Sequence, residues 1–312
     1  MPRILFVKTS SLGDVVHNGP AVSDAARALP GAEIDWVVEE PFAEVAAMHA
    51  AVRRVIPVAV RRWRRGLWRA STWSEMRAFR DALRAGRYDA VIDTQSLLKS
   101  ALIASLANGT RHGLDAASAR EPLAARFYDV VHAVPRGLHA VERNRMLAAA
   151  ALGYGLPAEI SYGLRAADAP ATAEACTVLL TMTSRADKLW PEARWIELGR
   201  ALGMRCLLPW GGDEERRRAE RIAHGVPHAE VQPRLTLGEL GALFARSAQV
   251  IGVDTGLTHL AAALGAPTVG LYCGSDPTLT GLHGAKRAKN LGGPGRAPAV
   301  AEVLAASREL AR

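Results

Sequence analysis

The chain has 312 residues, of which 49% are hydrophobic and 22% are charged, and its formal net charge is +8. This length exceeds the size at which one hydrophobic core usually stops growing, so two domains are expected. The composition is that of a packed globular protein and excludes long disordered tails. No apolar run is long enough for a membrane span or a signal peptide, which favours a cytoplasmic location. Three widely separated cysteines, Cys176, Cys206 and Cys273, predict neither a zinc site nor a disulfide framework.

The excess positive charge is concentrated in one segment. Residues 45–74 contain no Asp or Glu. The segment contains seven arginines: Arg53, Arg54, Arg61, Arg62, Arg64, Arg65 and Arg69. Such a block is either a solvated face or an anion-binding surface. Interleaved Trp63, Trp68 and Trp73 favour binding, because exposed indoles are unusual unless something apolar or flat meets them. A membrane surface or an amphiphilic anion fits best.

The first half of the chain alternates between strand and helix patterns, which is typical of a parallel α/β sheet. Strands are expected at residues 4–7, 34–38 and 90–93, and helices at 14–29, 78–85 and 97–106. Residues 152–170 are rich in Gly, Pro and Ala and are interpreted as a linker.

After the linker the same alternation restarts. Strands are expected at 176–180, 205–208, 250–253 and 268–272, and helices at 191–202, 213–223, 236–247 and 256–264. We therefore predict an N-terminal domain over residues 1–160 and a C-terminal domain over 161–312, whose last helix can pack back on the first domain.

A polar turn follows the first predicted strand, at the sheet edge where open parallel sheets place their ligands. The turn runs from Lys8 to Asp14 and contains Ser10, Ser11 and Gly13. It has neither the G-x-G-x-x-G nor the P-loop spacing, so a dinucleotide or triphosphate site is disfavoured here. Asp14 is a candidate general base or a helix-capping residue, and the two roles do not exclude each other.

A second candidate site follows the strand predicted at 250–253. Asp254, Thr255, Gly256, Leu257 and His259 lead from that strand into a helix. Small residues and the unpaired N–H groups of a helix start suit a phosphate or diphosphate. The alternative is an Asp cap with a glycine for turn geometry, but a turn needs only one of these residue types.

Two further stretches of the second half lie at the same predicted edge. Thr183, Ser184 and Lys188 follow the strand at 176–180 and suit a nucleotide's phosphates or ribose, although Lys188 could equally be a surface charge. Glu215 is a candidate for binding sugar hydroxyls, but Glu in a first helical turn also complements the helix dipole.

Several strings in order along nearly the whole chain resemble glycosyltransferase family 9, the ADP-heptose:lipopolysaccharide heptosyltransferases. The strings that carry the resemblance are VKTSSLGDVVH, IDWVVEEPFAE, VIPVAVRRWRR, YDAVIDTQSLLKSA, AREPLAARFY, HAVERNR, ADKLWPEARW, LPWGG and VDTGLTHLAAALGAP. The resemblance implies a GT-B architecture, in which two Rossmann-like domains face each other across a central cleft. KTSSLGDVVH and RRWRR are more similar to heptosyltransferase I than to heptosyltransferase II, which is the near alternative.

The resemblance implies an inverting transfer of L-glycero-D-manno-heptose from ADP-heptose to the first Kdo of Kdo-lipid A in lipopolysaccharide core synthesis. Asp14 matches the family's general base, and Lys188 its phosphate-side lysine, which we also count as catalytic. The matched donor-binding residues are Thr183, Ser184, Lys188, Glu215, Asp254, Thr255, Gly256, Leu257 and His259. The matched acceptor-binding residues are Ser10, Ser11, Gly13, Arg61, Arg62, Arg64, Arg120 and His139.

The implied enzyme is a cytoplasmic monomer that touches the inner membrane peripherally, binds no nucleic acid and needs no cofactor. Metal dependence is not expected, since no D-x-D pair stands near the donor loop. The chain departs from the family where Tyr272-Cys273-Gly274-Ser275 replaces the usual Tyr-Gly-Pro-Thr. Rival interpretations are a Rossmann oxidoreductase or epimerase, whose glycine fingerprint is missing, and a basic protein that binds nucleic acid or membrane through residues 53–73.

Overall fold

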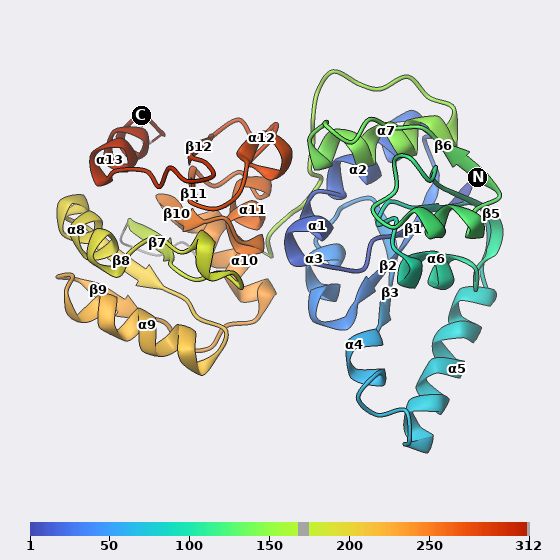
Figure 1. Cartoon of the computed structure of the whole chain (residues 1–312), viewed down its shortest axis with the longest axis horizontal. Helices are drawn as coiled ribbons and strands as arrows, with labels where there is room; N and C mark the ends of the chain where they lie inside the picture. The colour runs from blue at the N-terminus through green and yellow to red at the C-terminus, as the bar shows by residue number, and fades with distance from the viewer. Residues whose placement is uncertain (168–174, 311–312) are drawn as a thin grey trace. The chain divides into compact units, whose positions relative to one another are not determined.

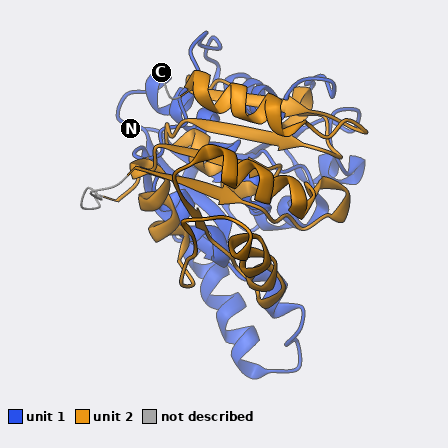
Figure 2. Cartoon of the chain, turned by 90° about the vertical axis from the view of Figure 1, so that its left-hand side faces the viewer, with its two compact units in different colours: residues 1–164 blue, residues 165–312 orange. Residues whose placement is uncertain are grey.

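The computed structural model describes residues 1–167 and 175–310. The chain forms two compact units, Met1–Leu164 and Arg165–Arg312, each drawn in its own colour in Figure 2. The division between them falls inside the predicted linker at 152–170. Each unit contains a six-stranded parallel sheet with helices around it, so the predicted α/β class is confirmed (Figure 1).

The first unit has the strand order β3-β2-β1-β4-β5-β6. The strands are β1 (Arg3–Val7), β2 (Glu33–Glu39), β3 (Val52–Val58), β4 (Arg87–Asp93), β5 (Asn108–Leu114) and β6 (Val130–His132). Sequence patterns predicted β1, β2 and β4, which are largely buried on both faces and therefore mostly apolar. They missed β3, β5 and β6, since these lie at or near the sheet edges and carry exposed polar residues such as Arg53 and Thr110.

The helices of the first unit cover both faces of its sheet. They are α1 (Leu12–Val16), α2 (Gly19–Ala28), α3 (Ala43–Ala47), α4 (Val60–Trp63), α5 (Ala70–Arg84), α6 (Leu98–Ala104) and α7 (Ala140–Leu152), with short 3₁₀ turns η1 (Glu40–Phe42) and η2 (Pro122–Phe127). The single helix predicted at 14–29 is two helices, because Pro20 cannot continue a helix and instead lies in the first turn of α2.

Helices pack on both faces of this sheet. On one face, Leu5, Val7 and Val91 pack with Phe79 and Leu83 of α5. On the other, α2 lies against α7, as Figure 1 shows. A buried ion pair joins these two helices, since Nε of Arg145 on α7 lies 2.7 Å from Oδ2 of Asp24 on α2.

The second unit has the strand order β12-β11-β10-β7-β8-β9. The strands are β7 (Cys176–Leu180), β8 (Arg205–Leu208), β9 (Ala229–Val231), β10 (Gln249–Val253), β11 (Thr268–Tyr272) and β12 (Ala288–Gly292). The helices are η3 (Ala186–Lys188), α8 (Glu192–Leu202), α9 (Asp213–His224), α10 (Leu237–Arg246), α11 (Gly256–Ala263), α12 (Pro277–Thr280) and α13 (Val300–Leu310). The four strands and four helices predicted for this half are all present.

The last helix belongs to the core of the second unit. Val300, Val303 and Ala306 of α13 are buried in one cluster with Trp190 and Trp195. Within the described part of the chain, no helix has both the length and the apolar character needed to cross a membrane.

Acid should destabilise the first unit through His49, whose side chain is buried between α2 and Gly163. Burial lowers the pKa of His49 to about 4, although a hydrogen bond to the Gly19 carbonyl at 3.1 Å opposes this. In the unfolded chain His49 is protonated near its ordinary pKa of 6.5. Between about pH 4 and that pKa the unfolded chain therefore binds more protons than the folded chain. The contribution of neutral His49 to the free energy of unfolding is therefore fully present above this pH range. It is lost as pH falls, by about 2 kcal/mol between about pH 7 and about pH 5.

Urea unfolding of the wild type and of His49→Gln at both pH values measures this contribution. The variant is less stable at neutral pH, but its stability should depend less on pH. Equal pH dependence in the two proteins would contradict the role of His49.

Candidate functional site

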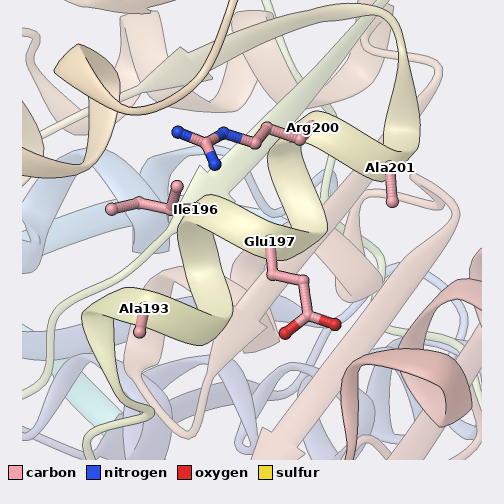
Figure 3. A pocket seen from close by; sticks show the side chains of 5 residues that line it. All are labelled: Ala193, Ile196, Glu197, Arg200 and Ala201. Atoms are coloured by element: carbon pink, nitrogen blue, oxygen red, sulfur yellow. The ribbon is translucent and has the colours of Figure 1, made fainter.

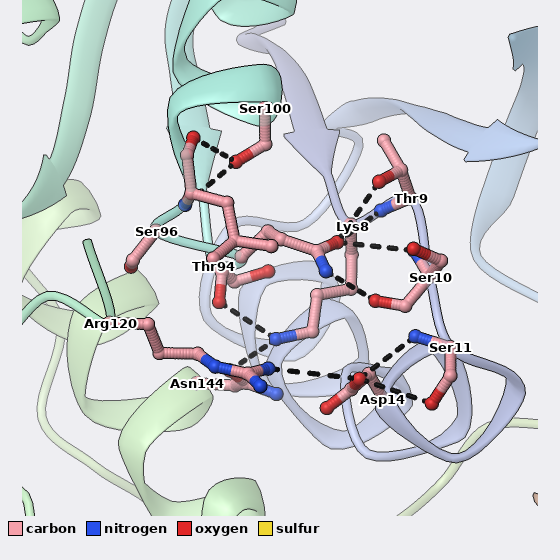
Figure 4. A network of polar contacts seen from close by, with 12 residues as sticks. Lys8, Thr9, Ser10, Ser11, Asp14, Thr94, Ser96, Ser100, Arg120 and Asn144 are labelled. Carbon is pink, nitrogen blue, oxygen red and sulfur yellow. Dashed lines mark hydrogen bonds and ion pairs between the residues drawn. The ribbon is translucent and has the colours of Figure 1, made fainter. Parts of the chain in front are cut away.

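Asp14 lies in the turn that follows β1, at the carboxyl edge of the first sheet. Its Oδ2 accepts hydrogen bonds from the Ser11 backbone N–H at 2.8 Å and from the Ser11 hydroxyl at 3.2 Å (Figure 4). These bonds close the first turn of α1, so Asp14 has the structural role that the sequence left open. Its side chain is still 29% exposed and can be reached by a ligand.

Arg120 brings a positive charge beside this carboxylate. One of its terminal nitrogens lies 4.0 Å from Asp14 Oδ2, and the arginine side chain is 58% exposed. The loop before η2 carries Arg120, far from Asp14 in the sequence. An exposed guanidinium next to a candidate base is well placed for an anionic acceptor.

Gln95, which follows β4, holds the backbone of the turn. Its side-chain oxygen accepts from the N–H of Thr9 at 2.7 Å and of Ser10 at 3.1 Å, and its amide nitrogen donates to the Ser10 carbonyl. Thr94, Gln95 and Ser96 are not among the predicted site residues, although a sequence signal for them exists. They are polar residues directly after a buried strand beside β1.

Two lysines at or beside the turn are also absent from the predicted site residues. Lys8 is buried and donates to the Thr94 carbonyl at 2.8 Å and to the Asn144 side-chain oxygen at 3.3 Å (Figure 4). Burial lowers the pKa of Lys8, while the charges of Asp14 and Asp93 oppose that change. Lys99 on α6 donates to the Ser10 hydroxyl at 2.8 Å, and burial lowers its pKa.

Two of the predicted acceptor residues have clear structural tasks. His139 is buried at the start of α7, where its Nδ1 accepts from the Val141 N–H at 3.1 Å. Arg62 forms ion pairs with Glu40 at 2.9 Å and with Glu75 at 2.7 Å, and hydrogen bonds to these two carboxylates raise its pKa. Acceptor binding by either residue stays a prediction.

The other arginines of the basic segment are more available. Arg61 donates its backbone N–H to Glu39 at the end of β2, and its guanidinium lies over the Phe42 ring at 5.6 Å. Arg64 is exposed. The expectation of three exposed indoles is wrong for Trp63, which is only 8% exposed, because its ring packs in the core under α5.

In the second unit, Asp254 connects three loops at the carboxyl edge of the sheet. Lys188 Nζ lies 2.6 Å from its Oδ2, His259 Nε2 lies 3.2 Å from its Oδ1, and the Ser275 hydroxyl donates to Oδ2. Burial by itself would raise the pKa of Asp254, but the hydrogen bonds from His259, Lys188 and Ser275 outweigh it and hold the pKa well below its usual range. Asp254 is therefore an ionised, fully bonded carboxylate.

The start of α11, beside Asp254, lies close to β10 and to the loop after β7. Thr183 donates its hydroxyl to the Asp254 carbonyl at 3.0 Å, which joins the loop after β7 to the loop after β10. A Cβ atom on Gly252 would lie 2.2 Å from the Thr258 hydroxyl oxygen, so only glycine lets α11 begin this close to the strand. Thr255, Gly256 and Leu257 are partly exposed at this start.

Three predicted donor residues differ in availability. Lys188 is paired with Asp254 and its side chain is 18% exposed. Glu215 accepts from the Gly211 N–H at 2.6 Å, which is a local helix-start contact. Ser184 is exposed. Contacts of these residues with a nucleotide sugar stay predictions.

The structure also contains a surface hollow away from these residues. It has a volume of about 560 Å³ and is lined by Ala193, Ile196, Glu197, Arg200 and Ala201 (Figure 3). All five lie on α8, and none is a predicted site residue. Among residues 1–167 and 175–310, no three His, Cys, Asp or Glu side chains gather closely enough to hold a metal ion.

Comparisons with known proteins agree with this arrangement. A model of glycosyltransferase family 9 (heptosyltransferase) matches residues 76–303. Lipopolysaccharide heptosyltransferase 1 of Escherichia coli K12 is 48% identical over 290 residues, covering 90% of this chain and 91% of the relative. The protein of the same name from Pseudomonas aeruginosa is 50% identical over 290 residues, covering 90% of this chain and 81% of the relative.

The solved structure of E. coli heptosyltransferase WaaC with ADP matches with a TM-score of 0.92 at 44% identity and covers 99% of both chains. E. coli ADP-heptose lps heptosyltransferase II matches with a TM-score of 0.79 at 19% identity, covering 99% of this chain and 98% of that one, which shows the fold alone. The predicted GT-B class is confirmed by these matches. Because the family model and close relatives cover most of its length, the chain belongs to glycosyltransferase family 9, the heptosyltransferases.

Proposed function

We propose that the chain is a heptosyltransferase I, which moves L-glycero-D-manno-heptose from ADP-heptose to the first Kdo of Kdo-lipid A. The identity of 48% to lipopolysaccharide heptosyltransferase 1 supports this assignment over heptosyltransferase II, whose solved structure is only 19% identical. Asp14 carries the proposal, since it is a reachable carboxylate held by Ser11 with a guanidinium beside it.

In the proposed reaction Asp14 takes the proton from the acceptor hydroxyl as its oxygen attacks the anomeric carbon of the heptose. The bond from that carbon to the diphosphate oxygen breaks in the same step, so ADP leaves and the configuration inverts. Ser11 donates to Asp14 and keeps the carboxylate oriented, while Gln95 fixes the backbone of Ser10. Ser11 and Gln95 therefore contribute positioning, and Asp14 carries out the proton transfer.

Groups of the second unit would stabilise the departing ADP. Its growing negative charge suits the N–H groups at the start of α11 and the ammonium of Lys188. Lys188 would share its charge between Asp254 and the phosphates. These groups supply the positive charge without a metal ion, so transfer should continue at an unchanged rate in excess EDTA, and a loss restored by Mg²⁺ would contradict that part of the proposal.

The acceptor would bind through cations around Asp14. Arg120 and Lys99 lie next to the turn, and Arg61 and Arg64 follow β3. Carboxylates of Kdo and phosphates of lipid A are matching anions. The protein would work as a cytoplasmic monomer at the inner membrane, consistent with an acceptor that is itself a lipid.

Replacing Arg120 with Ala should raise the acceptor's KM by about tenfold or more, the effect of losing one charge-assisted contact, and leave the donor's KM unchanged. Arg62→Ala is the matched control, because Arg62 is already paired with Glu40 and Glu75 and should change the acceptor's KM much less. Steady-state kinetics with each substrate varied separately provides the measurement. A larger effect at Arg62 than at Arg120 would reverse the assignment.

The whole proposal is tested by incubating the protein with ADP-heptose and Kdo-bearing lipid A and measuring the product by mass spectrometry. One added heptose is expected, with ADP released in equal amount. An acceptor that already carries the first heptose distinguishes the alternative, because a heptosyltransferase II would extend that substrate and leave Kdo-lipid A unchanged.

A further inference from the structure

The connection between α4 and α5, together with the first turn of α5, exposes several large apolar side chains. Leu67 is 48% exposed, Trp68 79% and Trp73 50%. The Trp73 indole N–H donates to the Leu67 carbonyl at 2.8 Å, so the three residues belong to one local structure. Both whole-chain views show this connection projecting beyond the sheet of the first unit (Figures 1 and 2). Grouped exposed apolar side chains of this size usually mark a contact surface.

α4, the connection and the start of α5 form a helical hairpin, whose tip is the connection. The base of this hairpin, around Trp63 and Phe79, is firmly packed. Trp63 is buried against Phe79 with a ring separation of 5.7 Å, and its indole N–H donates to Glu75 at 2.8 Å. Arg62 adds ion pairs to Glu40 and Glu75. The hairpin is therefore anchored at one end, while its tip presents apolar side chains to the solvent.

The charged side chains of the connection itself are all positive. Arg64, Arg65 and Arg69 lie in the connection and are exposed. The chain has no Asp or Glu from residue 45 to residue 74, and Glu75, the first acid afterwards, is paired with Arg62. No carboxylate of this segment offsets the three guanidiniums. Clustered arginines of this kind attract anionic lipid headgroups.

Indole rings combined with arginines match a lipid surface better than a nucleic acid. Tryptophan concentrates where an apolar phase meets water, since its ring is apolar and its N–H is polar. Leu67 adds apolar area that acyl chains can bury. A nucleic-acid backbone would bind the arginines but leave the Leu67 side chain in water.

We propose that residues 65–73 form a membrane-docking element. Leu67, Trp68 and Trp73 enter the headgroup region of an anionic bilayer, and Arg65 and Arg69 bind lipid phosphates. The inference extends the membrane contact of the proposed function and gives it a structural origin, separate from Arg120 and Lys99 at the acceptor site.

Vesicle sedimentation tests the docking element without either substrate. Wild-type protein should bind vesicles with about 30 mol% phosphatidylglycerol and should release from them as salt increases, because screening weakens the attraction. Leu67→Ser/Trp68→Ser should weaken binding at least about tenfold. Arg65→Gln/Arg69→Gln should weaken it about 30-fold, the effect of two basic side chains near an anionic surface.

Matched controls remove exposed apolar or arginine side chains elsewhere. Leu102 and Leu279 are 51% and 40% exposed, so Leu102→Ser/Leu279→Ser controls for lost apolar surface. Arg217 and Arg246 are exposed, so Arg217→Gln/Arg246→Gln controls for lost charge. Both control proteins should bind vesicles like the wild type. Wild-type behaviour of the docking variants, equal losses in the controls, or tighter binding of the wild type to duplex DNA than to vesicles would overturn the proposal.

An activity measurement separates this inference from the proposed function. With a Kdo acceptor stripped of its acyl chains, Leu67→Ser/Trp68→Ser should transfer heptose at the wild-type rate. With the acceptor embedded in vesicles, its rate should fall at least about tenfold. Absence of transfer by the wild type to the stripped acceptor would count against the proposed function, whereas an equal loss by the variant on both acceptors would count against docking.

Discussion

Asp14→Asn is expected to reduce turnover by a factor of about one hundred or more while the affinity for ADP stays unchanged. Asparagine keeps a side-chain oxygen that can accept the hydrogen bond from the Ser11 N–H, seen at 2.8 Å, so the first turn of α1 should persist. What the substitution removes is the basic oxygen that takes the acceptor's proton. The effect should therefore appear in kcat and not in the free energy of unfolding.

Asp115→Asn is a matched control for this experiment. Asp115 also closes a local turn in the first unit, where its carboxylate accepts from the Ser118 N–H at 2.8 Å. It lies outside the network around Asp14, so its turnover should remain near that of the wild type. Single-turnover transfer, ADP titration calorimetry and urea unfolding would be measured on all three proteins. Near-normal turnover by Asp14→Asn would remove Asp14 from the chemistry.

Asp254→Ala is expected to destabilise the protein by about 3 to 5 kcal/mol, the cost of breaking a buried ion pair by removing one partner. The Asp254 side chain is 6% exposed and those of Lys188 and His259 are 18% and 5% exposed. Alanine would leave the Lys188 ammonium and the His259 ring without their acceptor. ADP affinity should fall as well, because Asp254 holds the loops around the start of α11 together.

A double-mutant cycle separates the ion pair from the other contacts of Asp254. If Lys188 is held mainly by Asp254, the loss of stability in Lys188→Met/Asp254→Ala should be smaller than the sum of the two single losses. Asp276→Ala controls for loss of a carboxylate in this unit, since Asp276 is partly exposed and its side chain caps the short helix α12. Additive losses in the cycle would show that the pair contributes no coupling energy.

The strands that lead into both candidate turns, β1 and β10, could be predicted from the sequence. β1, β2 and β4 and four strands of the second unit are largely buried on both faces, and this burial imposes mostly apolar runs that are visible in the sequence. Turns after such strands necessarily lie at the ligand-binding edge of a parallel sheet. Asp14 and Asp254 were found in this way.

Edge strands and helix breaks were harder to predict. β3 is buried only at Ile56 and Val58, so its exposed arginines conceal the strand pattern, and β6 is a three-residue strand with no buried residue. Trp63 was interpreted as exposed because it stands among arginines, yet its position on α4 turns its ring toward Phe79. The sequence does not state which face of a short helix meets the core.

Composition, the βα alternation, the positions of both site turns and the family resemblance were determined by the sequence alone, because local patterns encode burial and turn geometry. Only the tertiary structure decided which side chains meet. Gln95 reaches Ser10, Lys99 donates to the Ser10 hydroxyl and Lys188 pairs with Asp254. These partners are distant along the chain, and the order of strands in each sheet brings them together, which no local pattern specifies.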